Sequence, residues 1–418
     1  MVEAQPRPRT PEEGLIFWAI VGTWGFWLFG ALYHVLPMLA WGLAGLSVWR
    51  WVVRTRATPV VPGVLVWVGV VLALLVALIA GHVDYELDTA VLVKSMLGWA
   101  KGWALLALLP LAGALLTVRP EILYRASAIL GAQSLLLVPV CMLAGFAGLP
   151  GVFFVSPLIL LGGGDSLFFE VGPYLADPGW PGFRLRFFAP WAPAAALVGC
   201  LMVVLSAFDR DKRWAAVGIS AGCAMSIFSQ SRLGLIATLL LAVLVPVLSR
   251  ATRPAFWAMV TVIAVVGLLG WPTLVDTIES GVDAFAAARA DSSRVRAALQ
   301  NIALHRWLTE APLWGHGIVE RGSHLVEFMP IGSHHTWNSL LFVKGLVGCL
   351  AVAIGLGWTL AELLAKAQAD RVARAGLGVG LVLLLFSFGE NLEILAYLAW
   401  PALLLLGIAM RRPLRWPA

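Results

Sequence analysis

Apolar runs long enough to cross a lipid bilayer recur along this chain of 418 residues. A spanning helix needs about 20 apolar residues, because the hydrocarbon layer is about 30 Å thick and backbone groups must bond within the segment. With 60% hydrophobic and 12% charged residues, the composition excludes an ordinary soluble domain. The sequence predicts an all-α polytopic membrane protein with about twelve transmembrane helices, at residues 15–32, 35–53, 60–81, 96–117, 126–148, 187–207, 214–229, 233–249, 255–275, 337–361, 375–389 and 394–410.

Basic residues occupy alternate loops between these spans. By the positive-inside rule, such loops face the cytoplasm, so both termini are expected there and the segment 276–336 on the opposite side. The formal charge of +6 follows from the inside loops and does not require a nucleic-acid partner. The basic loops carry Arg54, Arg56, Arg119, Arg125, Arg210, Lys212, Arg213, Arg250, Arg253, Lys366, Arg371, Arg374, Arg411, Arg412 and Arg415.

The predicted spans divide the chain into three parts. Residues 1–275 hold the first nine spans and an interfacial segment, 149–186, that faces outward. Residues 276–336 form one large helical outward loop. Residues 337–418 hold the last three spans and a cytoplasmic tail.

The large outward loop and its edge contain five of the seven histidines: His305, His316, His324, His334 and His335. An amphipathic helix is predicted over 294–307 and is expected to end before Pro312, because Val295, Leu299, Ile302 and Arg306 share a stripe at 100° per residue. Arg294 and Arg296 lie on different faces of this helix, so they cannot enter one pocket together, and the choice between them stays open. His305, His316 and His324 are expected at the surface.

Three further arginines lie at outward ends of spans, where positive charge is disfavoured. Arg184 and Arg186 precede the span at 187–207, and as a pair they favour anion binding over snorkelling of their side chains to the interface. Arg232 follows Ser229-Gln230-Ser231 and opens a helix, whose N-terminal N–H groups also attract anions. For Arg232 alone, both interpretations remain open.

Several classes of chemistry lack their sequence signals. HExxH, paired Cys/His sets and a DxD pair on an outward loop are missing, so no metal site is expected. The P-loop, GxSxG and Rossmann patterns are also missing, which argues against ATP hydrolysis, a serine nucleophile and a nucleotide cofactor. All four cysteines, Cys141, Cys200, Cys223 and Cys349, fall inside predicted spans as packing residues.

Four patterns in order resemble the superfamily of O-antigen ligases, O-antigen polymerases and bacterial protein O-oligosaccharyltransferases. Arginine leads into a phenylalanine- and proline-containing span start, and Ser-x-Ser-Arg opens a later span. Arginine is then followed by a helix and P-x-x-G-x-G, and a histidine precedes G-x-x-G in the next span. These patterns correspond to Arg184, Arg186 and Pro190; to Ser229–Arg232; to Arg296, Ala303, Pro312, Gly315 and Gly317; and to His334, Trp337, Gly345 and Gly348. Gln300 and His335 depart from the tryptophan and asparagine that the family often has.

The resemblance implies a GT-C-like, metal-independent, inverting glycosyltransferase without a cofactor. Arg184, Arg186, Arg232 and either Arg294 or Arg296 would hold the diphosphate of a donor glycan on undecaprenyl diphosphate. His334, or alternatively His335, would act as general base on the acceptor, a sugar of lipid A–core. Such an O-antigen ligase works at the periplasmic face of the bacterial inner membrane among membrane lipids, and we expect a monomer, with an oligomer left open.

Two alternatives use other partners or another chemistry. An O-antigen polymerase would extend a second lipid-linked glycan, and a protein transferase would modify Ser or Thr. A twelve-span transporter or flippase would instead need ionisable residues along a path at the membrane midplane, for which Lys101 and Lys344 are the candidates.

Overall fold

A computed structural model of the protein describes residues 7–53, 59–162, 164–176, 183–271, 273, 275–277, 279–280, 290–326, 328–332 and 335–414. The helices of the first half are α1 (Pro11–Val21), α2 (Thr23–Leu28), α3 (Leu32–Val53), α4 (Pro62–Asp84), α5 (Thr89–Lys101), α6 (Leu105–Leu115) and α7 (Pro120–Phe146). A short-stranded segment follows, with β1 (Phe154–Val155), η1 (Pro157–Leu161), η2 (Ser166–Phe168), β2 (Glu170–Val171), β3 (Tyr174–Ala176) and β4 (Phe183–Leu185).

The second half contains the remaining elements. They are α8 (Ala192–Ser206), α9 (Lys212–Phe228), α10 (Arg232–Leu248), α11 (Pro254–Leu269), α13 (Ala290–Glu310), β5 (Glu320–Arg321), η3 (His324–Val326), β6 (Pro330–Ile331), α14 (Thr336–Ala367), α15 (Arg371–Ser387), α16 (Leu392–Leu395) and α17 (Trp400–Met410). The strands pair only as three antiparallel ribbons, β1–β2, β3–β4 and β5–β6.

The protein is a multi-pass, mostly helical membrane protein. Among the described residues, five helices are long and apolar enough to cross a bilayer: α3, α4, the α5–α6 pair, α7 and α14. Shorter apolar helices are α8, α10, α11 and α17. Helices occupy all twelve predicted ranges, but many are shorter than a span because the chain breaks the apolar runs, as at Gly22 between α1 and α2. The prediction is therefore confirmed as a helical membrane bundle and not as a count of twelve spans.

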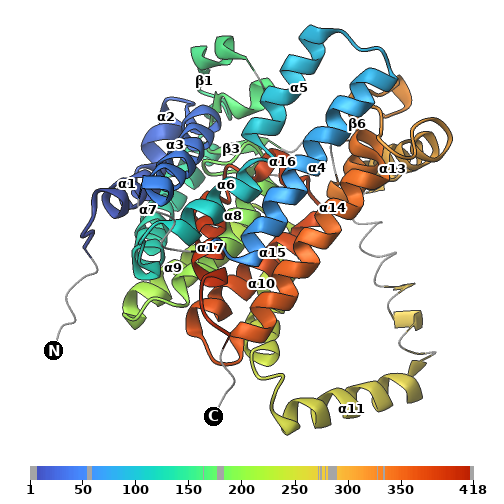
Figure 1. Ribbon diagram of the computed structural model, residues 1–418. Helices are drawn as coiled ribbons and strands as arrows, with labels where there is room; N and C mark the ends of the chain where they lie inside the picture. Colours follow the sequence, from blue (N-terminus) through green and yellow to red (C-terminus); the bar gives the residue numbers. More distant parts are fainter. Residues whose placement is uncertain are drawn as a thin grey trace.

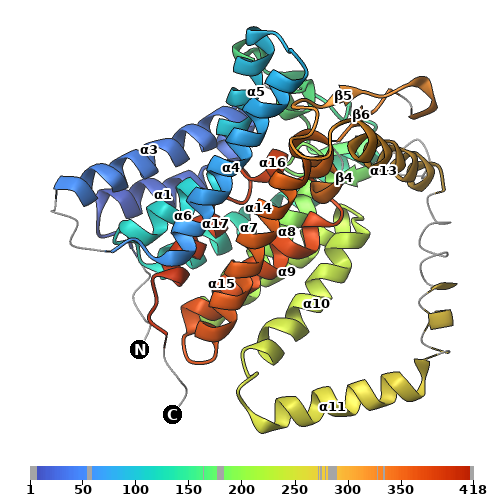
Figure 2. The ribbon, with the colours of Figure 1, turned by 45° about the vertical axis from the view of Figure 1, so that its right-hand side comes forward.

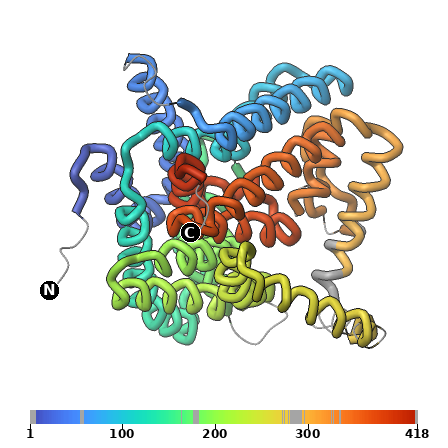
Figure 3. Tube along the Cα trace, turned by 60° about the horizontal axis from the view of Figure 1, so that its bottom comes forward, coloured from blue at the N-terminus to red at the C-terminus, as the bar shows by residue number. Residues whose placement is uncertain are grey.

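Helices from the two halves of the chain interleave in one bundle (Figure 1). α14 packs along α4, α17 along α6, and α8 along α9. The connections from α10 to α11 and from α14 to α15 lie at the lower end of Figure 2, whereas α5, α13 and β5–β6 lie at the upper end, which we call the α13 end. α11 extends away from the bundle in Figures 2 and 3, and none of the residues Pro254–Leu269 is buried.

α14 is interrupted where the α13 end of the bundle begins. Gly345 has φ +62° and ψ −165°, which is not helical. The N–H groups of His316 and Gly317 donate to the carbonyls of Phe342 and Val343 at 2.8 and 3.1 Å. On the other side of the break, the N–H groups of Leu346 and Val347 donate to the carbonyls of Pro312 and Leu313 at 2.9 and 3.3 Å. Residues 312–317, here called the splice segment, thus supply the hydrogen bonds that the broken helix lacks. Backbone groups inside a membrane bundle need such partners because they have no access to water.

The glycines of P-x-x-G-x-G are explained by this close approach. A Cβ on Gly315 would lie 2.5 Å from the backbone nitrogens of Lys344 and Gly345, and a Cβ on Gly317 would lie 2.8 Å from the ring of His82 in α4. Both glycines also have positive φ, of +71° and +76°, which side chains disfavour. Gly81 of α4 completes the contact, since its own Cβ would meet the backbone of Gly315 and Gly317.

Substitution of Gly315 by alanine tests this arrangement. The new methyl group must displace backbone atoms of α14, so Gly315→Ala should lower the stability of the folded protein by roughly 1–3 kcal/mol or more. Gly357→Ala is the control, because a Cβ there meets nothing within 4 Å and alanine favours helix over glycine by about 1 kcal/mol. Thermal unfolding of the purified variants in detergent measures both effects. An unchanged midpoint of thermal unfolding for Gly315→Ala would contradict the close contact between the splice segment and α14.

Candidate functional site

A pocket of about 80 Å³ lies at the α13 end, between α13, β6, the start of α14 and the end of α15. We call it the His335 pocket. It is lined by Leu299, Gln300, Ala303, Pro330, Gly332, His335, Asn338, Ser339, Phe388 and Gly389. The pocket combines an imidazole and three amide or hydroxyl groups with apolar walls, a composition that suits a polar substrate group.

α13 forms one wall of the pocket because its apolar stripe packs against η3, β6 and the first turns of α14. Val295, Leu299 and Ala303 are buried in a small core with Val326, Ile331, Phe342 and Val343. The predicted amphipathic helix and its stripe are confirmed, as is its end before Pro312. Gln300, next to Leu299 in sequence, reaches the pocket.

His335 is the N-cap residue of α14. Its Nδ1 accepts hydrogen bonds from the backbone N–H groups of Trp337 and Asn338, at 3.2 and 3.3 Å. An acceptor nitrogen carries no proton, so we assign the neutral tautomer with its proton on Nε2. Burial also lowers the pKa of His335, which favours the neutral ring. In this state Nδ1 caps the helix and Nε2 carries a proton that it can donate. His335 therefore has no free lone pair with which to accept a proton, so it is better suited to binding a substrate oxygen than to acting as a general base.

A buried polar network holds the start of α14 against the α15–α16 connection. The backbone N–H and hydroxyl of Thr336 both donate to the carbonyl of Glu390, at 3.1 and 2.6 Å. Asn391 donates to the hydroxyl of Ser339 at 3.2 Å, and Ser339 in turn donates to the carbonyl of Gly332. These bonds hold in place Gly332 and Ser339, which line the His335 pocket, and Glu390, which follows the lining residue Gly389.

Arg184 and Arg232 are brought together by the turn between α9 and α10. Arg184, in β4, donates from Nε to the carbonyl of Ser229 at 3.1 Å. Arg232 is the first residue of α10, whose N-cap Ser231 accepts from Gly234 N–H at 3.2 Å. The next residue, Leu233, contacts Gly389 of the His335 pocket, where an added Cβ would lie 2.6 Å from its side chain. The start of α10 therefore lies beside residue 389 of the pocket, and both arginines of this turn are half-buried.

Arg186 lies apart from Arg184 in a fully buried position. Its guanidinium contacts the Glu170 carboxylate at 3.2 Å and donates to the carbonyls of Gly172 and Pro190 at 2.5 and 3.2 Å. β4 ends at Leu185, between the two arginines, and Phe187, which follows them, has φ +53°. The contacts of Arg186 link β2 and the residue after it to Pro190, just before α8.

The remaining predicted site residues are less fully defined. Arg294 is exposed on α13. The side chain of Arg296 and the whole of His334 lie outside the described residues. Within the part of the chain that the structure describes, there is no cluster of three or more His, Cys, Asp or Glu residues suited to a metal ion.

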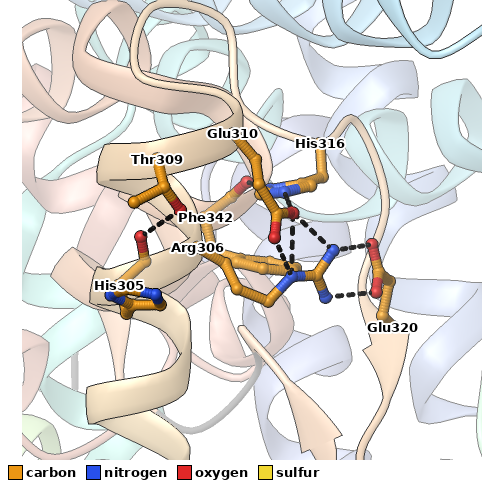
Figure 4. Close-up of polar contacts among 7 residues, drawn as sticks. All are labelled: His305, Arg306, Thr309, Glu310, His316, Glu320 and Phe342. Carbon is orange, nitrogen blue, oxygen red and sulfur yellow. Dashed lines mark hydrogen bonds and ion pairs between the residues drawn. The ribbon is translucent and has the colours of Figure 1, made fainter.

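Sequence reasoning missed an ionic network beside the pocket (Figure 4). His305 and His324 are exposed as predicted, but His316 is only 1% exposed and the prediction for it is wrong. His316 belongs to the splice segment, and its ring stacks on Phe342 at 4.2 Å. Its position between Gly315 and Gly317 was the available signal, because paired glycines indicate a crowded backbone.

Two substitutions of His335 test whether its ring caps α14. Asparagine is a strong N-cap residue and alanine is not, so His335→Ala should lose about 0.5–2 kcal/mol of stability while His335→Asn should retain most of it. Thermal unfolding in detergent measures the difference. If both variants unfold like the wild type, the ring does not cap α14.

Residues 215–353 match the family model described as O-Antigen ligase. The matched range contains Arg232, α13, the splice segment, His335 and the break at Gly345. No curated protein matches the chain. This match, over part of the chain, supports a relationship to the O-antigen ligase family.

Proposed function

We propose that the protein transfers a glycan from a lipid-linked diphosphate donor to an acceptor hydroxyl at the His335 pocket. The family comprises glycosyltransferase-like membrane enzymes, which supports transfer as the reaction class. The observation that supports the proposal is that the turn before α10, which carries Arg232 and binds Arg184, lies beside the pocket that contains His335. Arg184 bonds the turn that precedes Arg232, and the residue after Arg232 contacts the pocket wall.

The arginines would bind the diphosphate of the donor. A guanidinium is always charged and offers parallel N–H groups to phosphate oxygens. The N-terminus of α10 adds its partial positive charge next to Arg232. Arg294 or Arg296 would approach from α13. These cations would stabilise the charge that grows on the diphosphate as the sugar–phosphate bond breaks, without a metal ion.

We assign the general base to His334 and a hydrogen-bonding role to His335. The base takes the proton of the acceptor hydroxyl as that oxygen attacks the anomeric carbon, and attack from the face opposite the diphosphate inverts this carbon. His335 is a poor base in its capping geometry, because the lone pair on Nδ1 already accepts from the backbone. Its Nε2–H would bind an acceptor or phosphate oxygen instead.

The proposed substrates are O-antigen on undecaprenyl diphosphate and a sugar of lipid A–core. The protein would lie in the bacterial inner membrane with its termini in the cytoplasm and the α13 end in the periplasm. The charge distribution supports this orientation, since Arg250, Arg253, Arg371 and Arg374 lie in or beside the connections at the opposite end. An O-antigen polymerase fits the same family and would use a second lipid-linked glycan as acceptor.

Transfer by the purified protein tests the proposal. We expect wild-type protein in detergent, with EDTA, to move glycan from an undecaprenyl-diphosphate donor to rough lipopolysaccharide. Arg184→Lys and Arg232→Lys keep the charge but lose the paired N–H donors, so kcat/KM should fall roughly 10- to 100-fold. His334→Ala should reduce turnover about 10²–10⁴-fold.

Arg213→Lys is the matched control, because Arg213 is exposed near the start of α9 at the opposite end of the bundle and should not affect transfer. Longer lipid-linked chains without glycosylated lipopolysaccharide would identify a polymerase. Full activity in both arginine variants would reject the proposed site, whereas neither product from the wild type would reject the proposed function and favour the transporter alternative.

A further inference from the structure

The buried ring of His316 contacts two different elements through its two nitrogens. Nδ1 lies 3.0 Å from the carbonyl oxygen of Phe342, at the break in α14. Nε2 lies 2.9 Å from Oε2 of Glu310, the last residue of α13 (Figure 4). The ring thus joins the end of α13 to the broken helix that carries His335 at its start.

Both partners of the ring are hydrogen-bond acceptors. A carbonyl oxygen has no proton to donate, and the Glu310 carboxylate is ionised, because hydrogen bonds from Arg306 and then from His316 lower its pKa to about 2. A neutral imidazole has one N–H and would leave its second nitrogen facing an acceptor with a lone pair. Only the doubly protonated imidazolium donates to both oxygens.

The charges around the ring balance in the same state. Arg306 binds Glu310 at 2.9 and 3.1 Å and Glu320 of β5 at 2.5 and 3.2 Å. With His316 protonated, this network holds two positive and two negative side chains. A neutral His316 would leave one net negative charge beside a buried ring.

The other ionisable groups nearby belong to α4 and α14. Both ring nitrogens of His82 in α4 have hydrogen-bond partners, the carbonyl of Leu78 and the hydroxyl of Ser95, and neither partner is His316. The ring of Tyr85, which follows α4 and Asp84, lies 5.1 Å from that of His316. Lys344 is buried in α14, two residues beyond Phe342. Glu310 is the ionic partner that contacts His316 directly.

We propose that His316 is held as an imidazolium and acts as a positioning residue, clamping α13 to the break in α14. The clamp sets the distance between the α13 wall of the His335 pocket, at Leu299, Gln300 and Ala303, and the start of α14. Loss of one ring proton breaks one of the two bonds and so weakens this clamp between α13 and α14. The effect on transfer rests on the proposed function, whereas the protonation state does not.

The protonation state can be measured directly. Protein labelled with ¹⁵N-histidine, in detergent at pH 7.5, should give a two-bond ¹H–¹⁵N pattern of an imidazolium for His316, identified by its absence in His316→Gln. Raising the pH should convert it to a neutral pattern. Glu310→Gln removes the ionic acceptor and should produce the neutral pattern at lower pH, and it assigns the signal if His316→Gln does not fold. A neutral tautomer in the wild type at pH 7.5 would overturn the proposal.

The pH profile of transfer tests the positioning role. In the wild type, kcat/KM should fall at alkaline pH as the clamp opens. His316→Gln should be roughly tenfold less active near neutral pH and should lose this alkaline decline, while an acid limb due to a separate base remains. His305→Gln is the control, because His305 is exposed on the same helix (Figure 4) and should keep the wild-type profile.

The two measurements separate the possible failures. An imidazolium signal in a protein that transfers no glycan would support the clamp and reject the proposed function. Transfer with an unchanged alkaline limb in His316→Gln would reject the positioning role.

Discussion

The hydrogen bonds between the splice segment and the break in α14 determine how the rest of the α13 end is built. A helix inside a bundle cannot leave backbone groups without partners. The carbonyls of Phe342 and Val343 therefore require donors, and the splice segment supplies them together with acceptors for the next turn. Because this segment directly follows α13, the same bonds place α13 over the start of α14.

The His335 pocket follows from that placement. α13 provides its apolar wall, the N-cap of α14 provides an imidazole, and the α15–α16 connection closes one side. Arg184 and the turn before Arg232 approach the same wall from elements far away in sequence. Backbone contacts thus bring polar groups from four parts of the chain to one end of a membrane bundle.

Local periodicity predicted several elements well. The apolar stripe of α13 and its end before Pro312 depend on neighbours three and four residues apart, so they are visible in sequence. The predicted number of spans was less successful, because hydropathy does not show where an apolar segment breaks into short helices. The burial of Arg186 was also hidden, because it depends on the distant carboxylate of Glu170.

The sequence by itself determined that this is a helical membrane protein with five of its seven histidines in one large loop, because hydrophobicity and side-chain type can be read residue by residue. The order of its short patterns also resembles that of the O-antigen ligase family. Only the tertiary structure decided that Arg186 is buried against Glu170, that His335 caps a helix and that His316 contacts two acceptors. Those roles depend on which backbone groups lack partners after packing, and this is a property of the folded chain.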